Sequence, residues 1–365
     1  MADALIPLHA IKGRGAASQT PHRFARDVRE GFDDGWDTVQ NDVLQGHAPP
    51  ATQIIFEDAK SVIVKNDSPD IYFDYSVNPY RGCEHGCVYC YARPKHSYLG
   101  LSPGLDFETQ IIAKRNVAAV LRAELAKPSY VPKLLNIGSA TDCYQPVERE
   151  LRLTRQVMEV LREVQHPFSL ITKSSGVEHD LDLIAPMAAD HLAAVYITIT
   201  TLDAHLARVL EPRAAAPHRR LRTIEALARA GVPVGVSVAP QIPFINEDME
   251  QVLAAAAHAG ACSAFYTVLR LPWELSDIFR EWLELHYPQR AARVMARVQE
   301  MRGGKDYDSD FATRMKGEGV WAELLRTRFQ TACRKLGLNR TRTELDLSRF
   351  TPPRSGGAAA QGSLF

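Results

Sequence analysis

The sequence has few cysteines, no long apolar run and no excess of either charge, and each of these shortages excludes a class of protein. Its 365 residues include six cysteines, and its 43 basic residues equal its 43 acidic residues in number. Six unevenly placed cysteines do not form the disulfide framework of a small secreted domain, so we expect a reducing, cytoplasmic location. Balanced charge argues against a uniformly basic surface, although one face can still carry a local excess.

The sequence also lacks a stretch that is suited to a membrane. The longest weakly polar run, residues 253–273, is interrupted by His258, Ser263, Arg270 and Pro272. A membrane span needs about 18 or more uninterrupted apolar residues. We therefore expect no transmembrane segment and no membrane partner.

What the sequence does contain is enough apolar residues for a large core. With 45% hydrophobic and 24% charged residues, it has a globular composition, and its length suits one large α/β barrel or about two domains. We predict four parts: an N-terminal extension that is partly ordered at best, a core barrel, a helical basic C-terminal region and a low-complexity tail that is disordered. These parts are residues 1–50, 51–275, 276–350 and 351–365.

Short β-branched runs alternate with amphipathic stretches along the core, which is the pattern of successive β-α units and a parallel sheet. Six units of this kind predict a partial (β/α)6 barrel of the TIM type. The expected strands are residues 71–75, 134–138, 168–172, 193–200, 232–239 and 263–271, after two short strands at 53–56 and 61–64. The expected helices are residues 148–164, 217–230 and 247–259 within the barrel, with 276–302 and 319–336 after it.

The most informative residues are Cys83, Cys87 and Cys90, at spacings of four and three. Three thiolates from one loop can converge on a single metal centre, and Gly82 and Gly86 permit the tight turns that this requires. A structural zinc site needs four protein ligands, and only three cysteines are local. A four-iron cluster with three cysteine ligands leaves one iron open to the amine and carboxylate of S-adenosylmethionine (SAM). The alternative is a non-catalytic zinc-binding barrel whose fourth ligand is His85, His96 or a distant cysteine.

The three cysteines form the pattern Cys-x3-Cys-x2-Cys, with an aromatic residue before the last cysteine. The pattern lies just after the first strand of a β-α series, and it resembles the signature of the radical SAM enzymes. The flanking sequence is similar to the spore-photolyase-like branch over roughly residues 68–271. The strings that carry this likeness are Asn78-Pro79-Tyr80-Arg81-Gly82-Cys83, Tyr89-Cys90-Tyr91-Ala92-Arg93, residues 141–148 (TDCYQPVE), Ile171-Thr172-Lys173 and Glu211-Pro212-Arg213.

The resemblance implies a mechanism, in which a reduced [4Fe-4S] cluster passes one electron to SAM and yields methionine and a 5′-deoxyadenosyl radical that abstracts hydrogen from the substrate. It also implies an electron donor such as flavodoxin or ferredoxin. The cluster ligands would be Cys83, Cys87 and Cys90, and the SAM-binding residues would be Tyr89, Asp142, Lys173, Thr200, Glu211 and Arg219.

Barrel geometry agrees with part of this set. Strand C-termini face one mouth of a barrel, where Asp142, Lys173, Thr200 and Ala239 would be presented. The resemblance places Tyr89 against the adenine and pairs Lys173 with the SAM carboxylate. A lysine that ends an apolar strand is costly to bury without an anion, and the alternative is a surface lysine whose ammonium reaches the solvent. An arginine near Arg219 would serve the SAM site or pair with a glutamate that resembles Glu211.

The substrate is less well indicated. Spore photolyase repairs a thymine dimer lesion in DNA, and a cysteine hydrogen donor works there with tyrosines that Tyr89 and Tyr91 match. In that enzyme the donor lies three residues before the strand-end aspartate, where this chain has Ser139. Cys143 directly follows that aspartate, and it is either a hydrogen donor at the mouth or a buried structural cysteine. Cys262 and Cys333 are expected to be structural.

Two basic stretches bear on a DNA or RNA partner. Residues 217–222 (PHRRLR) begin a helix, and residues 321–354 carry eight basic and three acidic residues, a net charge of +5. Both suit a phosphate-binding face, although a charged run is usually a solvated helix surface. A peptide or small-molecule substrate is the alternative. Residues 302–311 have the glycines and mixed charge of a loop that closes over the mouth, or of a solvated connector.

Overall fold

Strands and helices alternate along the chain from residue 53 onward. The computed structural model describes residues 9–25 and 50–353, so most of the predicted N-terminal extension and of the predicted tail at 351–365 lies outside the described residues. The strands are β1 (Gln53–Glu57), β2 (Ile63–Lys65), β3 (Tyr75–Val77), β4 (Tyr80–Arg81), β5 (Gln110–Lys114), β6 (Leu135–Ile137), β7 (Phe168–Thr172), β8 (Ala193–Thr198), β9 (Val234–Ser237) and β10 (Ser263–Phe265).

Helices connect these strands and extend beyond the last one. They are α2 (Asp106–Thr109), α3 (Val117–Leu125), α4 (Glu148–Leu151), α5 (Leu153–Glu163), α6 (Leu181–Ala189), α7 (Ala204–Leu210), α8 (Pro217–Arg229), α9 (Met249–His258), α10 (Leu275–His286), α11 (Pro288–Glu300) and α12 (Gly319–Leu336). Three short 3₁₀ helices are η1 (Arg93–Leu99), η2 (Ser175–Asp180) and η3 (Leu347–Arg349).

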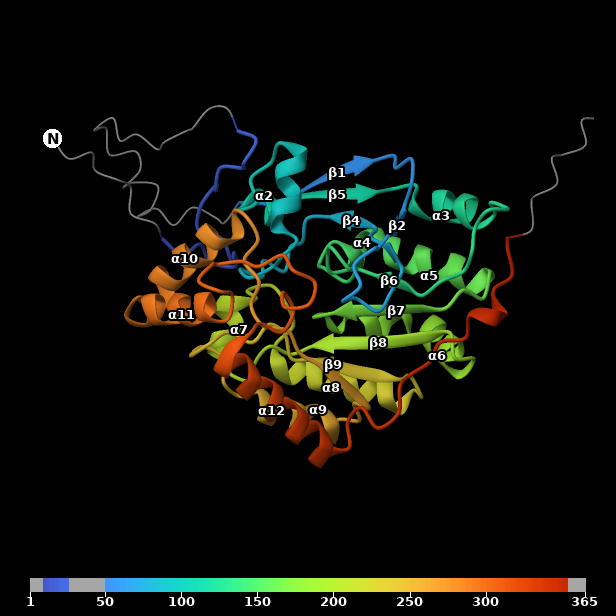
Figure 1. The fold of residues 1–365 in the computed structure, drawn as a ribbon. Helices are drawn as coiled ribbons and strands as arrows, with labels where there is room; N and C mark the ends of the chain where they lie inside the picture. The colour runs from blue at the N-terminus through green and yellow to red at the C-terminus, as the bar shows by residue number, and fades with distance from the viewer. Residues whose placement is uncertain (1–8, 26–49, 354–365) are drawn as a thin grey trace, which may run out of the picture.

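The larger sheet confirms the predicted partial barrel. Its order is β10-β9-β8-β7-β6-β3-β2, and the six strands from β3 to β10 run parallel, while β2 is antiparallel at the edge. The described sheet is open, with β10 and β2 at its ends. Because connected strands are parallel, all six C-termini lie at one end of the sheet, where the arrows of β7 and β8 point in Figure 1.

One face of this sheet forms the core and the other faces the barrel interior. Alternate residues such as Phe168, Leu170 and Val195 are completely buried against the surrounding helices. Their neighbours along the strands point the opposite way because side chains alternate between the two faces. Crossover connections between parallel strands are almost always right-handed, so successive connecting helices are expected on the same face of the sheet.

The remaining strands were only partly predicted. β1 pairs with β5 in a separate three-stranded sheet, β1-β5-β4, and the sequence pattern did not reveal β5. The expected strand at 71–75 is found at Tyr75–Val77, and the last parallel strand ends at Phe265 rather than at 271.

Two expected long helices are each divided in two. Arg152 has φ of 51°, which separates α4 from α5. Tyr287 separates α10 from α11 because it precedes Pro288, and a residue before proline is disfavoured in the helical conformation.

The two ends of the parallel strands are covered by different segments. At the C-terminal end lie α10, α11 and the loop that follows them (Figure 1), and the Val268 amide bonds the Met315 carbonyl. At the N-terminal end, the stretch that follows α12 crosses the strands. Its contacts there are Asn339 N–H to the Cys262 carbonyl and Asp346 N–H to the His191 carbonyl.

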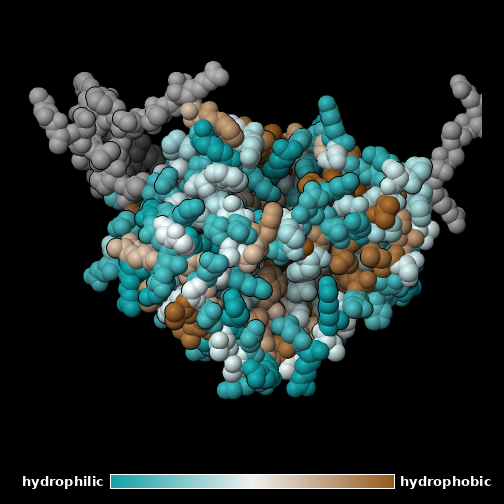
Figure 2. Space-filling model, viewed as in Figure 1, coloured by the Kyte–Doolittle hydropathy of each residue, from teal (hydrophilic) through white to brown (hydrophobic). Residues whose placement is uncertain are grey.

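The face seen in Figure 1 is mostly hydrophilic, and its hydrophobic residues lie in small separate patches (Figure 2). None of the helices in the described parts of the chain has the length and apolar character that crossing a membrane requires.

Candidate functional site

The three clustered cysteines lie in the loop between β4 and η1. Cys83 and Cys87 are buried and Cys90 is partly exposed, and none of them is in a disulfide. Gly82 and Gly86 have φ of 81° and 68°, and this left-handed conformation agrees with the expectation that the two glycines permit tight turns. Burial raises the pKa of the Cys87 thiol to about 12, although Lys173 acts in the opposite direction.

A buried ion pair that sequence reasoning missed holds this loop. Arg93 is completely buried and donates from Nε to the Cys87 carbonyl at 2.9 Å and from Nη2 to the Gly86 carbonyl at 3.1 Å. Its Nη2 also pairs with Glu108 Oε1 at 2.5 Å. Because the guanidinium is fully satisfied, the backbone that carries the cysteines is fixed from inside.

The N-terminal residues contact the other side of the same loop. Glu108 accepts hydrogen bonds from the Gly15 and Ala16 amides at 3.0 and 2.9 Å. A Cβ at Gly15 would lie 1.8 Å from the Gly86 carbonyl oxygen, so only glycine fits there. Residues 9–25 therefore form part of the structure around the cysteines.

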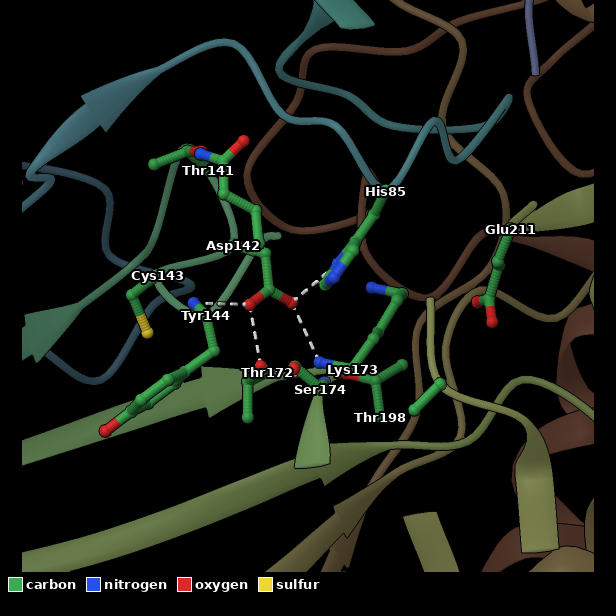
Figure 3. A network of polar contacts seen from close by, with 12 residues as sticks. His85, Thr141, Asp142, Cys143, Tyr144, Thr172, Lys173, Ser174, Thr198 and Glu211 are labelled. Carbon is green, nitrogen blue, oxygen red and sulfur yellow. Dashed lines mark hydrogen bonds and ion pairs between the residues drawn. The ribbon is translucent and has the colours of Figure 1, made fainter. Parts of the chain in front are cut away.

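Asp142 follows β6 and fixes the segment after β7 (Figure 3). Its Oδ1 accepts from Thr172 Oγ1 at 2.6 Å, and its Oδ2 accepts from the Lys173 amide at 2.8 Å. His85 Nδ1 lies 3.2 Å from Oδ2. Burial by itself raises the pKa of the Asp142 carboxyl, but His85, Thr172 and Lys173 outweigh it, so the net pKa is below the ordinary value.

Lys173 is presented at the C-terminal end of β7, as predicted. Its side chain is partly buried, and its Nζ lies 5.8 Å from the centre of the Tyr89 ring. Burial lowers the pKa of this ammonium, but Cys87, Glu211 and Asp142 raise it more, and the net pKa is above the ordinary value. Among the described residues, the ammonium has no hydrogen-bond acceptor and no ion-pair partner. The site thus contains a cation surrounded by acidic groups that it does not contact.

Glu211 forms a second polar centre beside Lys173. Its carboxylate is buried and accepts hydrogen bonds from Tyr89 and Thr200, and it pairs with the guanidinium of Arg220. Burial raises the pKa of Glu211, but Arg220 and Lys173 lower it by more than burial raises it, so the net pKa is below the ordinary value and the carboxylate is ionised. The structure therefore brings together the predicted residues Tyr89, Lys173, Thr200 and Glu211.

Arg219 does not pair with Glu211, and Arg220 does so instead. The Arg219 guanidinium bonds both Glu178 oxygens, at 2.6 and 2.7 Å, and it is partly exposed. Successive residues of a helix point about 100° apart, so only one of two adjacent arginines on α8 can face the interior. The sequence indicated the helix but not its rotation.

Cys143 does not reach the mouth, contrary to the hydrogen-donor hypothesis. Its side chain is completely buried within the main core. It points away from Lys173 and Glu211 (Figure 3). The cysteine is fixed there because its carbonyl accepts a bond from Thr154 Oγ1 at 2.6 Å and its sulfur lies against Gly138.

Tyr91 lies nearer to the surface than Tyr89. Its ring is 46% exposed, and its hydroxyl donates to the Ser139 carbonyl. The guanidinium of Arg270 lies 5.4 Å from the centre of this ring and 6.0 Å from that of Tyr307. Tyr307 belongs to the segment at 302–311, which was interpreted either as a loop that closes over the mouth or as a solvated connector, and this segment lies beside Tyr91.

The loop is anchored at two points. Arg302 donates to the Leu269 carbonyl at 2.7 Å, and Asp306 accepts from Ser276 and Arg280. Ala239, the remaining residue expected at the mouth, accepts a long bond of 3.4 Å from Thr200 through its carbonyl.

Comparisons with known proteins agree with this geometry. Residues 77–256 match the model of the Radical SAM superfamily. An uncharacterized protein of Mycobacterium bovis is 36% identical over 252 residues, which cover 67% of this chain and 74% of that protein. An uncharacterized protein of Methanocaldococcus jannaschii is 25% identical over 215 residues, covering 59% of this chain and 77% of the relative.

Solved structures of spore photoproduct lyase variants share the fold. One has a TM-score of 0.52 at 16% identity, covering 78% of this chain and 80% of the other. A second, with bound AdoMet and dinucleoside spore photoproduct, has a TM-score of 0.51. Together with the cysteine loop and the parallel sheet, the match of residues 77–256 to the family model shows that the chain belongs to the radical SAM superfamily.

Proposed function

We propose that this enzyme binds a [4Fe-4S] cluster through Cys83, Cys87 and Cys90, binds SAM beside Lys173, and uses the resulting radical on a nucleic-acid substrate. Membership of the family implies the cluster and SAM. The observation that carries the residue assignment is that three free cysteines lie in one loop and that Lys173, at the C-terminal end of β7, has a partly buried ammonium with no ion-pair partner among the described residues.

The donor set fits a cluster that is completed from outside the chain. Cysteine thiolates are the usual ligands of iron-sulfur clusters. Each of the two local histidines has a contact through one ring nitrogen, since His85 Nδ1 faces Asp142 and His96 Nε2 faces the Gln110 carbonyl at 3.1 Å, and a zinc-ligating histidine makes the same kind of contact. Membership of the radical SAM superfamily is therefore what favours a centre with three protein ligands over a closed zinc site.

The chain's own residues supply positioning and charge. When bound, the cluster supplies the electron that cleaves SAM to methionine and a 5′-deoxyadenosyl radical. Lys173 offers an ammonium to the SAM carboxylate, and Asp142 holds the backbone of Lys173 in place. Glu211, kept ionised by Arg220, fixes the phenol of Tyr89, so the ring keeps one orientation beside the ammonium.

Support for a nucleic-acid substrate comes from the groups at the mouth. The Arg270 guanidinium lies close to the rings of both Tyr91 and Tyr307, and aromatic rings with arginine are typical of sites that stack bases and neutralise phosphates. Ser139 replaces the donor cysteine and Cys143 is buried, so the hydrogen returned to the substrate would not come from a cysteine at either position. A peptide or small-molecule substrate is the second candidate, and a flavodoxin- or ferredoxin-type protein is the proposed electron donor.

The test combines cofactor analysis with substrate-dependent turnover. The chain is reconstituted anaerobically, its iron and sulfide are measured, and release of 5′-deoxyadenosine is compared with UV-irradiated DNA, undamaged DNA, RNA and no addition. We expect about four iron and four sulfide per chain, and faster release with a nucleic acid whose binding weakens with salt. Stoichiometric zinc without sulfide would overturn the cluster assignment. A cluster-loaded enzyme that no nucleic acid stimulates or binds would overturn the substrate assignment alone.

A further inference from the structure

A cavity of about 760 Å³ opens inside the partial barrel, at the end of the strands opposite to Lys173. It is lined by residues near the beginning of several strands, such as Ser169 of β7 and Ser263 of β10. The stretch at 339–347, which follows α12, forms the opposite wall. The volume is within the range of about 300–1,000 Å³ that is typical of ligand sites.

The cavity is separate from the mouth but lies on the same face of the sheet. Ser169 and Lys173 are four residues apart, so their side chains point to the same side. At about 3.3 Å per residue they lie about 13 Å apart along the chain. The cavity is therefore a second site below the mouth rather than part of the cysteine and Lys173 site.

The cavity exists because small residues occupy the inner face of the sheet. In a closed barrel the interior is filled by bulky branched side chains. Here Ser169, Ala194 and Ser263 line it instead. Gly235 shares this face, and a Cβ there would lie 2.5 Å from the Tyr196 ring, so the glycine makes room for that ring.

Four aromatic rings line the space that these small residues leave: Tyr72, Phe73, Tyr196 and Phe265. The centre of the Tyr196 ring is 5.6 Å from that of Phe265 and 6.4 Å from that of Tyr72. Tyr72 is 51% exposed, and Tyr196 and Phe265 are only partly buried. A cavity with exposed aromatic faces favours a ligand that has a flat ring.

The wall opposite the sheet carries positive charge. Arg342 lines the cavity and Arg340 lies two residues before it, and both are exposed. Neither takes part in an ion pair with another described residue, and Glu344 is the acidic residue of the lining. Exposed arginines beside aromatic rings suit an anion attached to that flat ring, because a guanidinium binds phosphate oxygens in a two-pronged manner.

We propose that this cavity binds a nucleotide unit, with its base against the rings of Tyr72 and Tyr196 and its phosphate at Arg342. The same chemistry is offered by a free nucleotide and by one unit of a single strand. The inference goes beyond the proposed function, because the residues of this site are distinct from those that bind the cluster and SAM. It also assigns a role to part of the C-terminal basic segment that the sequence singled out.

The experiment measures binding of two probes to the full chain. These are dTMP, by calorimetry, and fluorescein-labelled (dT)10, by anisotropy, each at several salt concentrations. Arg342→Ala is expected to weaken binding about tenfold and to reduce the slope of log affinity against log salt by about 1. Tyr72→Leu is expected to weaken it about fivefold or more, because base stacking contributes about 1–3 kcal/mol. The matched control is Arg229→Ala on α8, whose side chain is 78% exposed and pairs with Glu225.

Each outcome decides the proposal. A nucleotide site is supported if both probes bind and if Arg342→Ala and Tyr72→Leu weaken this binding while Arg229→Ala does not. Binding of (dT)10 alone would assign the site to one unit of a single strand. No binding of either probe, or equal losses in Arg229→Ala, would overturn it. Cys87→Ala is expected to leave dTMP binding unchanged, so failure of this site is distinguishable from failure of the proposed reaction. Circular dichroism of each variant verifies folding, and Arg342→Lys provides a conservative change at the same position.

Discussion

Lys173 and Lys114 both have side chains that are at least partly buried, but their surroundings differ. The difference distinguishes a lysine in a candidate binding site from one that is only packed in the fold. Lys173, at the mouth, is surrounded by Cys87, Glu211 and Asp142, which raise the pKa of its ammonium. Lys114, at the end of β5 in the small sheet, is 6% exposed, and burial together with Arg81 lowers its pKa to about 8.

The comparison shows how burial and neighbouring charge compete. Both ammonium groups lose solvation, and the loss favours the neutral form in each case. At the mouth, nearby acidic groups more than offset this cost, so the ammonium stays charged without a direct partner among the described residues. In the small sheet, nearby acidic groups do not offset the cost of burying Lys114, so this lysine lowers the free energy of unfolding near neutral pH. A persistent, unpaired cation is what the binding of an anionic cofactor group requires.

The largest expected effect comes from removing a cysteine beside Lys173. Cys87→Ala removes one of the three proposed cluster ligands, and cysteine thiolates are the groups that hold such clusters. Iron and sulfide after anaerobic reconstitution should fall sharply, and release of 5′-deoxyadenosine should drop to background. Both are measured on the same preparation.

A matched cysteine at the other end of the strands gives the control. Cys333 is buried on α12, far along the chain from the loop. Cys333→Ala should retain both iron and release. If Cys87→Ala released 5′-deoxyadenosine at the parental rate, the mouth would not be the cluster site. The different surroundings of Lys173 and Lys114 would then need an explanation other than cofactor binding.

The sequence was sufficient for the fold where strands and helices are long or strongly patterned. The run at 168–172 and the helix at 319–336 were predicted with the boundaries that the structure has. Strand β5 was missed because its pairing with β1 is decided by contacts between residues distant in sequence. Periodicity reports burial of a face, and it does not report which strand lies beside which.

The structure brings together residues that a motif or a strand end indicated, whereas the residues that support them were not predicted. Lys173 was indicated by the family resemblance and by its position at the end of an apolar strand. Arg93 and Glu108 were missed, since a charged pair buried by folding looks like any other charged residues in sequence. The sequence indicated an arginine near Arg219 as the partner of Glu211, whereas the partner is Arg220, because the rotation of a helix about its axis depends on packing.

The second prediction uses that neighbouring pair of arginines. Arg220→Met leaves the Glu211 carboxylate buried without its cation, which should reduce the free energy of unfolding by about 3–5 kcal/mol. Arg219→Met, on the partly exposed side of α8, should reduce it by about 1 kcal/mol or less. Urea unfolding of the two variants measures both values. Equal effects would show that the Glu211 centre is no more buried than the surface pair.

The third prediction concerns the lysine that lacks compensation. The pKa of Lys114 is about 8 in the folded state, below its ordinary value of 10.5. Between pH 8 and pH 10.5 the unfolded chain therefore binds more protons than the folded chain, and this residue makes the free energy of unfolding rise with pH. Below pH 8 its full penalty applies. Lys114→Met should therefore stabilise the chain at pH 7, by up to about 3 kcal/mol, and the gain should shrink toward pH 10.

Thermal or urea unfolding of wild type and Lys114→Met at pH 7, 8, 9 and 10 tests this, and the difference between the two proteins removes the contribution of other titrating groups. A gain that stays constant with pH would mean that methionine merely packs better. Loss of stability at pH 7 would mean that the Lys114 ammonium has a partner that compensates for its burial.

The smallest expected effect concerns the other member of the pair. Lys173→Met removes the ammonium that is expected to meet the SAM carboxylate, and loss of one charge-assisted bond should weaken SAM binding about ten- to a hundredfold. Equilibrium binding of SAM to the cluster-loaded protein measures it, and Lys114→Met should bind SAM as the wild type does. Lys173→Arg should recover part of the affinity, because it keeps the charge but changes its shape. If Lys173→Met bound SAM with unchanged affinity, the acidic groups around Lys173 would be holding a structural cation, and the difference between the two lysines would concern folding alone.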